Sequence, residues 1–219
     1  MPLTSPHTPI ATSEKFRGKS GISNYADFVI ETDAVVGNIM TALKQSEAAK
    51  NTLVIFSTDN GTASAANFKE LEKHGVDLHN HFKGHKAQIH EGGHRVPFIV
   101  HWPGKTPAGS RCDEVVGLND FMATVADLLD AKIPANNAED STSILPLITG
   151  EKKFLPNRPC VINHDYRGKF AIRKGPWKLV EGGKLYNLKY EPKETTDVAT
   201  KHPERGAELK KTLKTYQQQ

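Results

Sequence analysis

A short polar segment that follows a buried strand is the strongest chemical feature of the sequence. Residues 52–57 form an almost wholly apolar, β-branched run, which predicts a strand buried on both faces, and Asp59, Asn60 and Gly61 come soon after it. In open α/β sheets, ligands bind beyond the carboxyl ends of the strands. A carboxylate and an amide oxygen are hard donors that suit Ca²⁺ or Mg²⁺. The same residues also favour an ordinary turn, so a metal site is one of two interpretations.

A lysine follows in a loop that can reach the same crevice. Lys86 ends the segment 83–86 and precedes a Gly-Gly turn and a second buried run at residues 96–102. A point positive charge in that position suits a sulfate or phosphate oxygen. Taken alone, Lys86 is more simply read as an exposed loop lysine, and His7, which lies between two prolines, carries no separate signal.

Histidines concentrate in one part of the chain, where seven of the ten lie between His74 and His101. Residues 90–94 read HEGGH and fit the H-E-x-x-H pattern of zinc proteases, which requires both histidines on one face of a helix. Two adjacent glycines and the strand that begins at Val96 argue against a helix there. A structural zinc site lacks nearby cysteines and a regular ligand spacing, so solvated histidines or a polar cleft are favoured.

Neither of the two cysteines has the surroundings of a nucleophile. Cys112 precedes two acidic residues, whose negative charge raises a thiol pKa, and Cys160 follows a proline at the start of a predicted strand. A single bridge and two unpaired buried thiols are both compatible with the sequence, whereas a disulfide-dense scaffold is excluded.

The composition is typical of a soluble globular chain. The 219 residues are 37% apolar and 25% charged, with a net charge of +4. Scattered charges without interleaved aromatics argue against nucleic-acid binding. The longest apolar stretches fall far short of the ~20 residues of a membrane span. The first residues lack the basic and apolar regions of a signal peptide.

Apolar periodicity predicts two parts of different texture. The first part, residues 1–152, alternates helices and strands, which indicates an α/β fold with a mainly parallel sheet flanked by helices. The second part, residues 153–219, has short segments between glycine-rich turns, which predicts a small antiparallel sheet plus a terminal helix. The predicted helices are at 25–43, 121–129 and 203–216, and the predicted strands at 52–57, 96–102, 160–163, 170–173, 177–180 and 184–186. Residues 133–143 are expected to form a polar surface loop.

Five short motifs, in this order, resemble those of the type I sulfatases of the alkaline phosphatase superfamily. They are residues 6–9 (PHTP), 58–61 (TDNG), 84–86 (GHK), 91–97 (EGGHRVP) and 102–104 (WPG). Residues 143–150, 177–188 and 194–197 resemble the C-terminal region of that family. The resemblance covers essentially the whole chain. It implies an alkaline-phosphatase-like fold and a sulfuric ester hydrolase of the arylsulfatase type.

The resemblance implies a role for each matching residue. Asp59 and Asn60 match ligands of the family's calcium ion, which makes Ca²⁺ the implied cofactor. Lys86 matches the lysine that contacts the sulfate and the leaving-group oxygen, and His7 matches a histidine that also contacts the sulfate ester. Glu91, the neighbouring glycines and Arg95 match a structural motif. The implied substrate is an aryl sulfate or a sulfated carbohydrate, and intact members of the family are expected to be periplasmic or secreted.

The nucleophile of that family has no counterpart in this sequence. In the family it is a formylglycine made from Cys or Ser within C/S-x-P-x-R, and neither cysteine nor any serine lies in that pattern. The paired aspartates that complete the calcium site are also missing. We therefore expect this chain to correspond to the C-terminal half of a sulfatase, truncated relative to the intact enzyme and inactive by itself.

Two other functions remain open. A sibling phosphohydrolase of the same superfamily binds two transition metals through Asp/His clusters, typically Asp-His after a strand, where this chain has Asp59-Asn60. A non-catalytic module that binds sulfated glycans would use the basic, histidine-rich loop. His164, Asp165 and Arg167 are candidates for the rim of a pocket, although a surface turn is the simpler interpretation.

Overall fold

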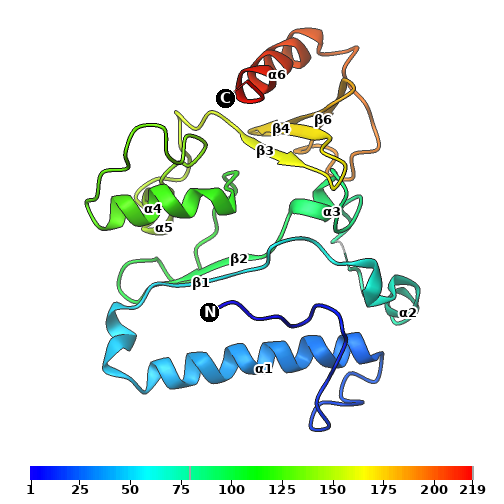
Figure 1. Cartoon of the computed structure of the whole chain (residues 1–219), viewed down its shortest axis with the longest axis vertical. Helices are drawn as coiled ribbons and strands as arrows, with labels where there is room; N and C mark the ends of the chain where they lie inside the picture. Colours follow the sequence, from blue (N-terminus) through cyan, green and yellow to red (C-terminus); the bar gives the residue numbers. More distant parts are fainter. Residues whose placement is uncertain (79, 219) are drawn as a thin grey trace.

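The structure is a computed structural model that describes residues 1–78 and 80–218 (Figure 1). Its elements, in chain order, are α1 (Asn24–Lys44), the 3-10 turn η1 (Glu47–Asn51), β1 (Val54–Ser57), η2 (Ser64–Ala66), α2 (Phe68–Lys73), α3 (Glu91–His94), β2 (Phe98–His101), η3 (Leu118–Asp120), α4 (Phe121–Leu128), α5 (Leu145–Ile148), β3 (Val161–His164), β4 (Phe170–Lys174), β5 (Trp177–Val180), β6 (Lys184–Asn187) and α6 (Pro203–Tyr216).

The first predicted helix is confirmed as α1, and its start is stabilised from both sides. The Ser23 hydroxyl accepts the N–H of Ala26 at 3.2 Å, which is the usual N-cap interaction. The buried Asp27 carboxylate accepts the N–H groups of Gly18 and Ser20 at 2.6 and 2.7 Å, which attaches the preceding loop to the helix. No helix in the described part of the chain combines the length and the apolar character needed to cross a membrane.

The two strands of the first part pair with each other, but not as expected. β1 and β2 are antiparallel, with Val54 opposite His101 and Ser57 opposite Phe98. The mainly parallel sheet predicted for residues 1–152 is therefore wrong for these strands. Parallel neighbours are joined by a crossover, usually a long helix. The described part of the segment between β1 and β2 instead contains the short η2, α2 and α3, and it turns back so that β2 returns alongside β1.

The predicted C-terminal sheet and helix are confirmed. The four strands lie in the order β3-β4-β5-β6, and each is antiparallel to its neighbour. α6 packs on β4 and β5, and Figure 1 shows it over the sheet. The core between them contains Cys160, Ile172, Leu179, Leu185, Leu209 and Leu213. The division of the chain at residue 152 stays a prediction.

The predicted loop at 133–143 has no helix or strand, and the buried Asp120 fixes its end. The Asp120 carboxylate accepts the N–H groups of Gly117 and Thr142 at 2.7 and 3.0 Å. It also forms an ion pair with Arg158 at 2.7 Å. This one carboxylate therefore joins the start of α4 to the loop and to the segment before β3.

Large apolar side chains remain exposed on α1, on β2 and around α4. They are Val29, Ile30, Ile39, Ile99, Leu118, Met122, Val125, Leu128 and Leu129. In Figure 1, α1 lies apart from the β1–β2 pair, with the N-terminal segment between them. Single exposed apolar residues are normal on a protein surface, whereas a contiguous patch of them marks an interaction site.

The segment after β1 packs directly on the glycines of α3. The N–H of Gly61 donates to the carbonyl of Gly93 at 3.0 Å. A Cβ atom built on Gly61 would lie only 1.8 Å from the carbonyl oxygen of Gly92. Because the obstructing atom belongs to the backbone, no side-chain rotation relieves the clash. Only glycine therefore permits this approach.

Replacing Gly61 with alanine should destabilise the protein by about 1–3 kcal/mol, because the two backbone segments must separate. Urea unfolding followed by circular dichroism measures the effect. Gly37→Ala in α1 is a matched control, since nothing lies within 4 Å of its added Cβ. Alanine there should leave stability unchanged or raise it by about 1 kcal/mol. Equal stability of the Gly61→Ala and wild-type proteins would contradict the close packing.

Leu209→Ala should destabilise the C-terminal core by about 2–5 kcal/mol, because it removes a side chain that is 0% exposed and leaves a cavity. Leu129 is 68% exposed, and Leu129→Ala should change stability by less than about 0.5 kcal/mol. The same urea titration compares the two variants, and similar losses for both would argue against the described core.

Candidate functional site

Two loops that carry predicted site residues lie side by side. The N–H of Lys86 donates to the carbonyl of Thr62 at 3.0 Å, so the Lys86 loop runs along the segment that begins at Asp59 and Asn60. Together with the Gly61–Gly93 hydrogen bond, this contact joins the carboxyl end of β1 to both ends of the loop 83–94. Asp59, Asn60 and Lys86 therefore belong to one region of the fold.

The side chains of Asp59 and Asn60 have the donor chemistry of a calcium site but supply only part of one. Asp59 is exposed, and its carboxylate accepts no hydrogen bond from the described residues. The Asn60 amide nitrogen donates to the carbonyl of Gly61 at 3.2 Å, which leaves the amide oxygen for another partner. Ca²⁺ takes about six to eight oxygen ligands. No group of three or more His, Cys, Asp or Glu residues suited to a metal occurs in residues 1–78 and 80–218.

Lys86 is half-buried and keeps its charge available. Its ammonium group forms no ion pair or hydrogen bond with the described part of the chain, while its carbonyl lies 3.0 Å from Nδ1 of His85. The His85 ring in turn packs edge-on against Phe68, with the ring centroids 5.4 Å apart. The base of the Lys86 side chain is thus held, and its charged end remains available to an anion.

The β3–β4 turn borders the Lys86 loop. The Asp165 carboxylate accepts the N–H groups of Lys169 and Arg167 at 2.9 and 2.8 Å, and these bonds lower the pKa of Asp165 below its usual value. Arg167 belongs to the same turn, which agrees with the simpler interpretation of Asp165 and Arg167, whereas His164 is the last residue of β3. The N–H of Tyr166 also donates to the carbonyl of Ala87 at 3.2 Å, which brings the turn next to Lys86.

The described residues give His7 no contact with these loops. His7 is exposed, its Nδ1 lies 2.9 Å from the carbonyl of Thr8, and its N–H donates to the carbonyl of Thr4 at 3.0 Å. These partners are all local in sequence. The predicted role of His7 therefore stays a prediction.

The segment HEGGH contains a helical turn, which the sequence analysis had argued against. Glu91–His94 forms α3, a single turn in which two glycines are tolerated because backbone surrounds them. His90 stays extended before this turn, and its Nδ1 lies 3.3 Å from the carboxylate of Glu194. Because His90 lies outside the helical turn, the two histidines do not share one helix face as a protease zinc site requires. His79 lies outside the described residues.

A buried network of charges, which the sequence analysis missed, lies behind these loops. The Lys178 ammonium lies 3.0 Å from a carboxylate oxygen of Glu91 and 3.0 Å from one of Glu194, and Arg173 forms an ion pair with Glu91. Glu91, Lys178 and Glu194 are only 4%, 3% and 0% exposed. The negative charges of the two carboxylates are thus compensated by the positive charges of Lys178 and Arg173, which offsets the cost of burying them. The one sequence signal was a lysine inside the apolar strand WKLV.

The network also determines the ionisation of its members. Burial raises the pKa of Glu194, but the hydrogen bond from His90, the Lys178 ammonium and the Glu91 N–H together outweigh burial and hold the pKa below its usual value. Burial lowers the pKa of the nearby His94, and the charge on Lys178 lowers it further. Nε2 of His94 is buried without a hydrogen-bond partner in the described structure. Glu194 is therefore charged and His94 neutral at neutral pH.

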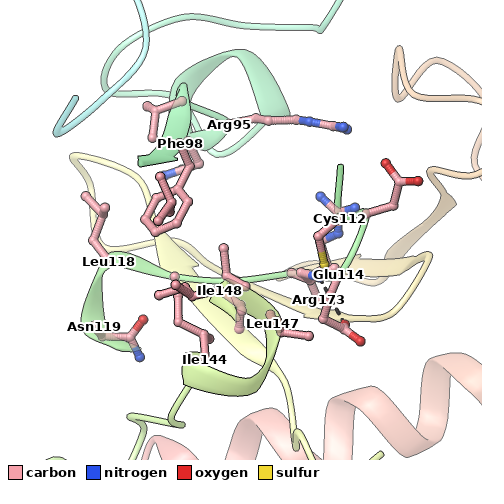
Figure 2. Close-up of a pocket in the computed structure, with 18 of the residues that line it drawn as sticks. Arg95, Phe98, Cys112, Glu114, Leu118, Asn119, Ile144, Leu147, Ile148 and Arg173 are labelled. Atoms are coloured by element: carbon pink, nitrogen blue, oxygen red, sulfur yellow. Dashed lines mark hydrogen bonds between the residues drawn. The ribbon is translucent and has the colours of Figure 1, made fainter. Parts of the chain in front are cut away.

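A cavity of about 820 Å³ opens beside the end of β1 (Figure 2). Its polar lining includes Asp59, His94, Arg95 and Arg173, and its apolar lining includes Phe98, Ile144, Leu147, Ile148 and Val161. Figure 2 shows Arg95 across the cavity from Ile144, Leu147 and Ile148. The Arg95 guanidinium lies over the Phe82 ring, 4.4 Å from its centroid. The polar wall also includes Glu91, Asp113 and Glu114, so the cavity joins a wall of mixed charge to a large apolar one.

Both cysteines are free, and their surroundings differ. Cys112 is exposed, which corrects the expectation that both unpaired thiols are buried. Cys160 is buried in the C-terminal core, and burial raises the pKa of its thiol.

Two family models match the chain, and each covers more than half of it. The sulfatase model matches residues 1–131, and the model described as N-sulphoglucosamine sulphohydrolase, C-terminal, matches residues 79–219. The two matches overlap in the segment that contains Lys86 and α3. Together they extend over the complete sequence.

Individual relatives agree with the family models. An N-acetylgalactosamine-6-O-sulfatase of Bacteroides thetaiotaomicron is 29% identical over 94% of this chain, which spans 44% of that relative. The steryl-sulfatase of Homo sapiens is 36% identical over 67% of this chain, which spans 25% of it. A solved structure described under the metabolism of multiple glycosaminoglycans by B. thetaiotaomicron has a TM-score of 0.89 and 28% identity to this chain. The match covers 99% of this chain and 49% of that structure's chain. The chain thus spans about half the length or less of these relatives, and it belongs to the sulfatase family.

Proposed function

We propose that this chain supplies one side of the active site of a calcium-dependent sulfuric ester hydrolase. The observation that carries the proposal is the hydrogen bond between Lys86 and Thr62, which brings the Lys86 loop beside the segment of Asp59 and Asn60. The ammonium group of Lys86 suits a negatively charged sulfate oxygen. The side-chain oxygens of Asp59 and Asn60 suit a calcium ion in the same region. Membership in the sulfatase family supports the same reaction class.

Each residue has a defined task in this proposal. Asp59 and Asn60 hold Ca²⁺, which supplies Lewis-acid polarisation of the sulfate when it is bound. Lys86 stabilises negative charge on the sulfuryl oxygens and on the departing alcohol oxygen. His7 binds the same ester group, once the N-terminal segment lies over the loops. Arg95, which is exposed and lines the neighbouring cavity, offers a further positive charge to the anion.

The nucleophile in this proposal is a formylglycine outside these 219 residues. The sequence has no C/S-x-P-x-R segment, and Cys160 is buried with a raised thiol pKa. A partner segment also needs a surface to pack against. The exposed apolar side chains of α1, β2 and α4 offer such a surface, and β2 pairs directly with β1. We accordingly propose that the chain by itself does not turn over sulfate esters.

A sulfated carbohydrate is the substrate class that we favour over an aryl or steryl sulfate. The relative that matches 94% of the chain is named as an N-acetylgalactosamine-6-O-sulfatase, whereas the steryl-sulfatase matches only 67%. The polar side of the cavity, which has Arg95, His94 and several carboxylates, also suits a ligand rich in hydroxyl groups. The sibling phosphohydrolase remains less favoured, because Asn60 stands where that chemistry needs histidine.

The proposal predicts that calcium-dependent activity appears only when the chain is joined to a segment that carries the nucleophile. The isolated chain with Ca²⁺ should hydrolyse a chromogenic aryl sulfate no faster than its Lys86→Ala variant. Joined to the amino-terminal half of a sulfatase relative, made in a host that generates formylglycine, the chain should hydrolyse N-acetylgalactosamine 6-sulfate. Chelation by EGTA should remove this activity, and added Ca²⁺ should restore it.

Matched variants identify the residues that this activity needs. Lys86→Ala and Asp59→Ala should each lower kcat/KM by about 100-fold or more, since each removes charge stabilisation of the transition state. Lys69→Ala and Asp33→Ala change exposed residues of α2 and α1 and should have no effect. A calcium-dependent rate of the isolated chain that Asp59→Ala abolishes would refute the external nucleophile. Retention on sulfated glycan without turnover in the joined protein would instead support a binding module.

A further inference from the structure

Glu194 is a completely buried acidic residue that binds the Lys86 loop from the C-terminal part of the chain. It lies between β6 and α6, and its side chain is 0% exposed. One carboxylate oxygen lies 3.0 Å from the Lys178 ammonium and 3.3 Å from Nδ1 of His90, and the other accepts the N–H of Glu91 at 2.6 Å. The Lys83 ammonium donates to the Glu194 carbonyl at 3.2 Å. Both the side chain and the backbone of Glu194 therefore contact the loop 83–91.

The backbone of Glu194 is held in a conformation that this residue type rarely adopts. Its φ is +52°, in the left-handed region where a side chain other than that of glycine, asparagine or aspartate is unfavourable. Such conformations persist only where the surrounding interactions determine them, and they gather at sites with a role beyond packing. The four contacts with the loop and with Lys178 are interactions of that kind.

From Glu194, hydrogen bonds continue to the predicted site residues. Glu91 begins α3, and the next residue, Gly92, donates its N–H to the carbonyl of Lys83 at 2.7 Å. The carbonyl of Gly93 accepts the N–H of Gly61, and the N–H of Lys86 donates to Thr62. The start of α3, both ends of the loop and the segment after β1 therefore form one hydrogen-bonded unit.

We propose that Glu194 is a positioning residue, which orients the Lys86 loop and the Asp59–Asn60 segment relative to each other through the start of α3. The inference rests on the proposed function, because that function makes the relative position of Lys86 and Asp59 important. It goes beyond that function, since Glu194 itself touches neither the sulfate nor the calcium ion. The C-terminal sheet then contributes to the site by holding its geometry.

Glu194→Gln is the decisive variant. It keeps the shape of the side chain and one acceptor oxygen, but it removes the charge that Lys178 requires and directs an amide N–H toward donors. Glu191→Gln is the matched control. Glu191 lies in the same segment before α6, where its carboxylate accepts the N–H groups of Thr195 and Thr196 at 2.8 and 3.3 Å.

Hydrogen exchange of the isolated chain, followed by NMR without calcium or a sulfate ester, separates positioning from general stability. In Glu194→Gln, exchange at the amides of Gly61, Lys86 and Gly92 should rise about tenfold, as expected when one buried hydrogen bond weakens a local structure. Exchange at Ile172 and Leu179, in the C-terminal core, should not change. Glu191→Gln should leave both groups unchanged.

Two results would overturn the inference. No rise at the loop amides would mean that Glu194 does not hold them, and an equal rise at the core amides would make Glu194 a general stabiliser. If Glu194→Gln does not fold, Lys83→Ala replaces it, because Lys83 is exposed and its loss removes only the contact with the Glu194 carbonyl. That variant should raise exchange about threefold at the loop amides alone. Unchanged exchange in it would refute the proposal.

The exchange experiment is independent of the proposed chemistry. Unaltered activity of Lys86→Ala in the joined protein would refute the sulfatase role of Lys86, while the exchange result for Glu194 would still stand. Conversely, unchanged loop exchange in Glu194→Gln would remove the positioning role and leave the proposed function intact.

Discussion

The contact between Gly61 and the glycines of α3 is the constraint on which the candidate site depends. A Cβ atom at Gly61 would meet the backbone of Gly92 at 1.8 Å, so the segment after β1 reaches α3 only because Gly61 carries no side chain. The hydrogen bond from Gly61 to Gly93 then fixes the approach. Since Asp59 and Asn60 come directly before Gly61, their position follows from this contact. The antiparallel return of β2 alongside β1 follows as well, because α3 leads directly into β2.

Buried ion pairs attach α3 to the C-terminal sheet. Glu91, at the start of α3, and Glu194 share the Lys178 ammonium, and Arg173 completes the balance of charge. Lys178 and Arg173 lie on adjacent strands and are register partners, so the sheet presents both cations toward α3. Removing one member of such a buried network leaves an uncompensated charge, which costs far more than an exposed ion pair gains. The C-terminal sheet is thereby joined to the loop that holds Lys86.

The distribution of apolar surface shows where this chain is well packed and where it is not. The C-terminal sheet and α6 enclose a core with side chains that are 0–9% exposed. Around β1, by contrast, α1 buries only Asp27, and apolar residues of α1, β2 and α4 face outward. The chain spans 44% of one relative and 49% of a similar solved structure. A site that lies on the poorly covered side of the molecule is accessible to a further segment, in keeping with the proposed external nucleophile.

The sequence by itself determined the longer helices, the strands and the family, and it suggested the candidate residues. Local periodicity located α1, the C-terminal strands and α6, and short motifs such as TDNG and EGGHRVP carried the sulfatase resemblance, because both are properties of neighbouring residues. Only the tertiary structure decided the antiparallel pairing of β1 with β2, the helical turn within HEGGH and the network around Glu194. Each of these depends on residues far apart in the chain: 40 positions separate Ser57 from the carbonyl of Pro97, and 103 separate Glu91 from Glu194. Strand direction, tolerance of glycine in a helical turn and pairing of buried charges are set by such distant partners, which no local pattern records.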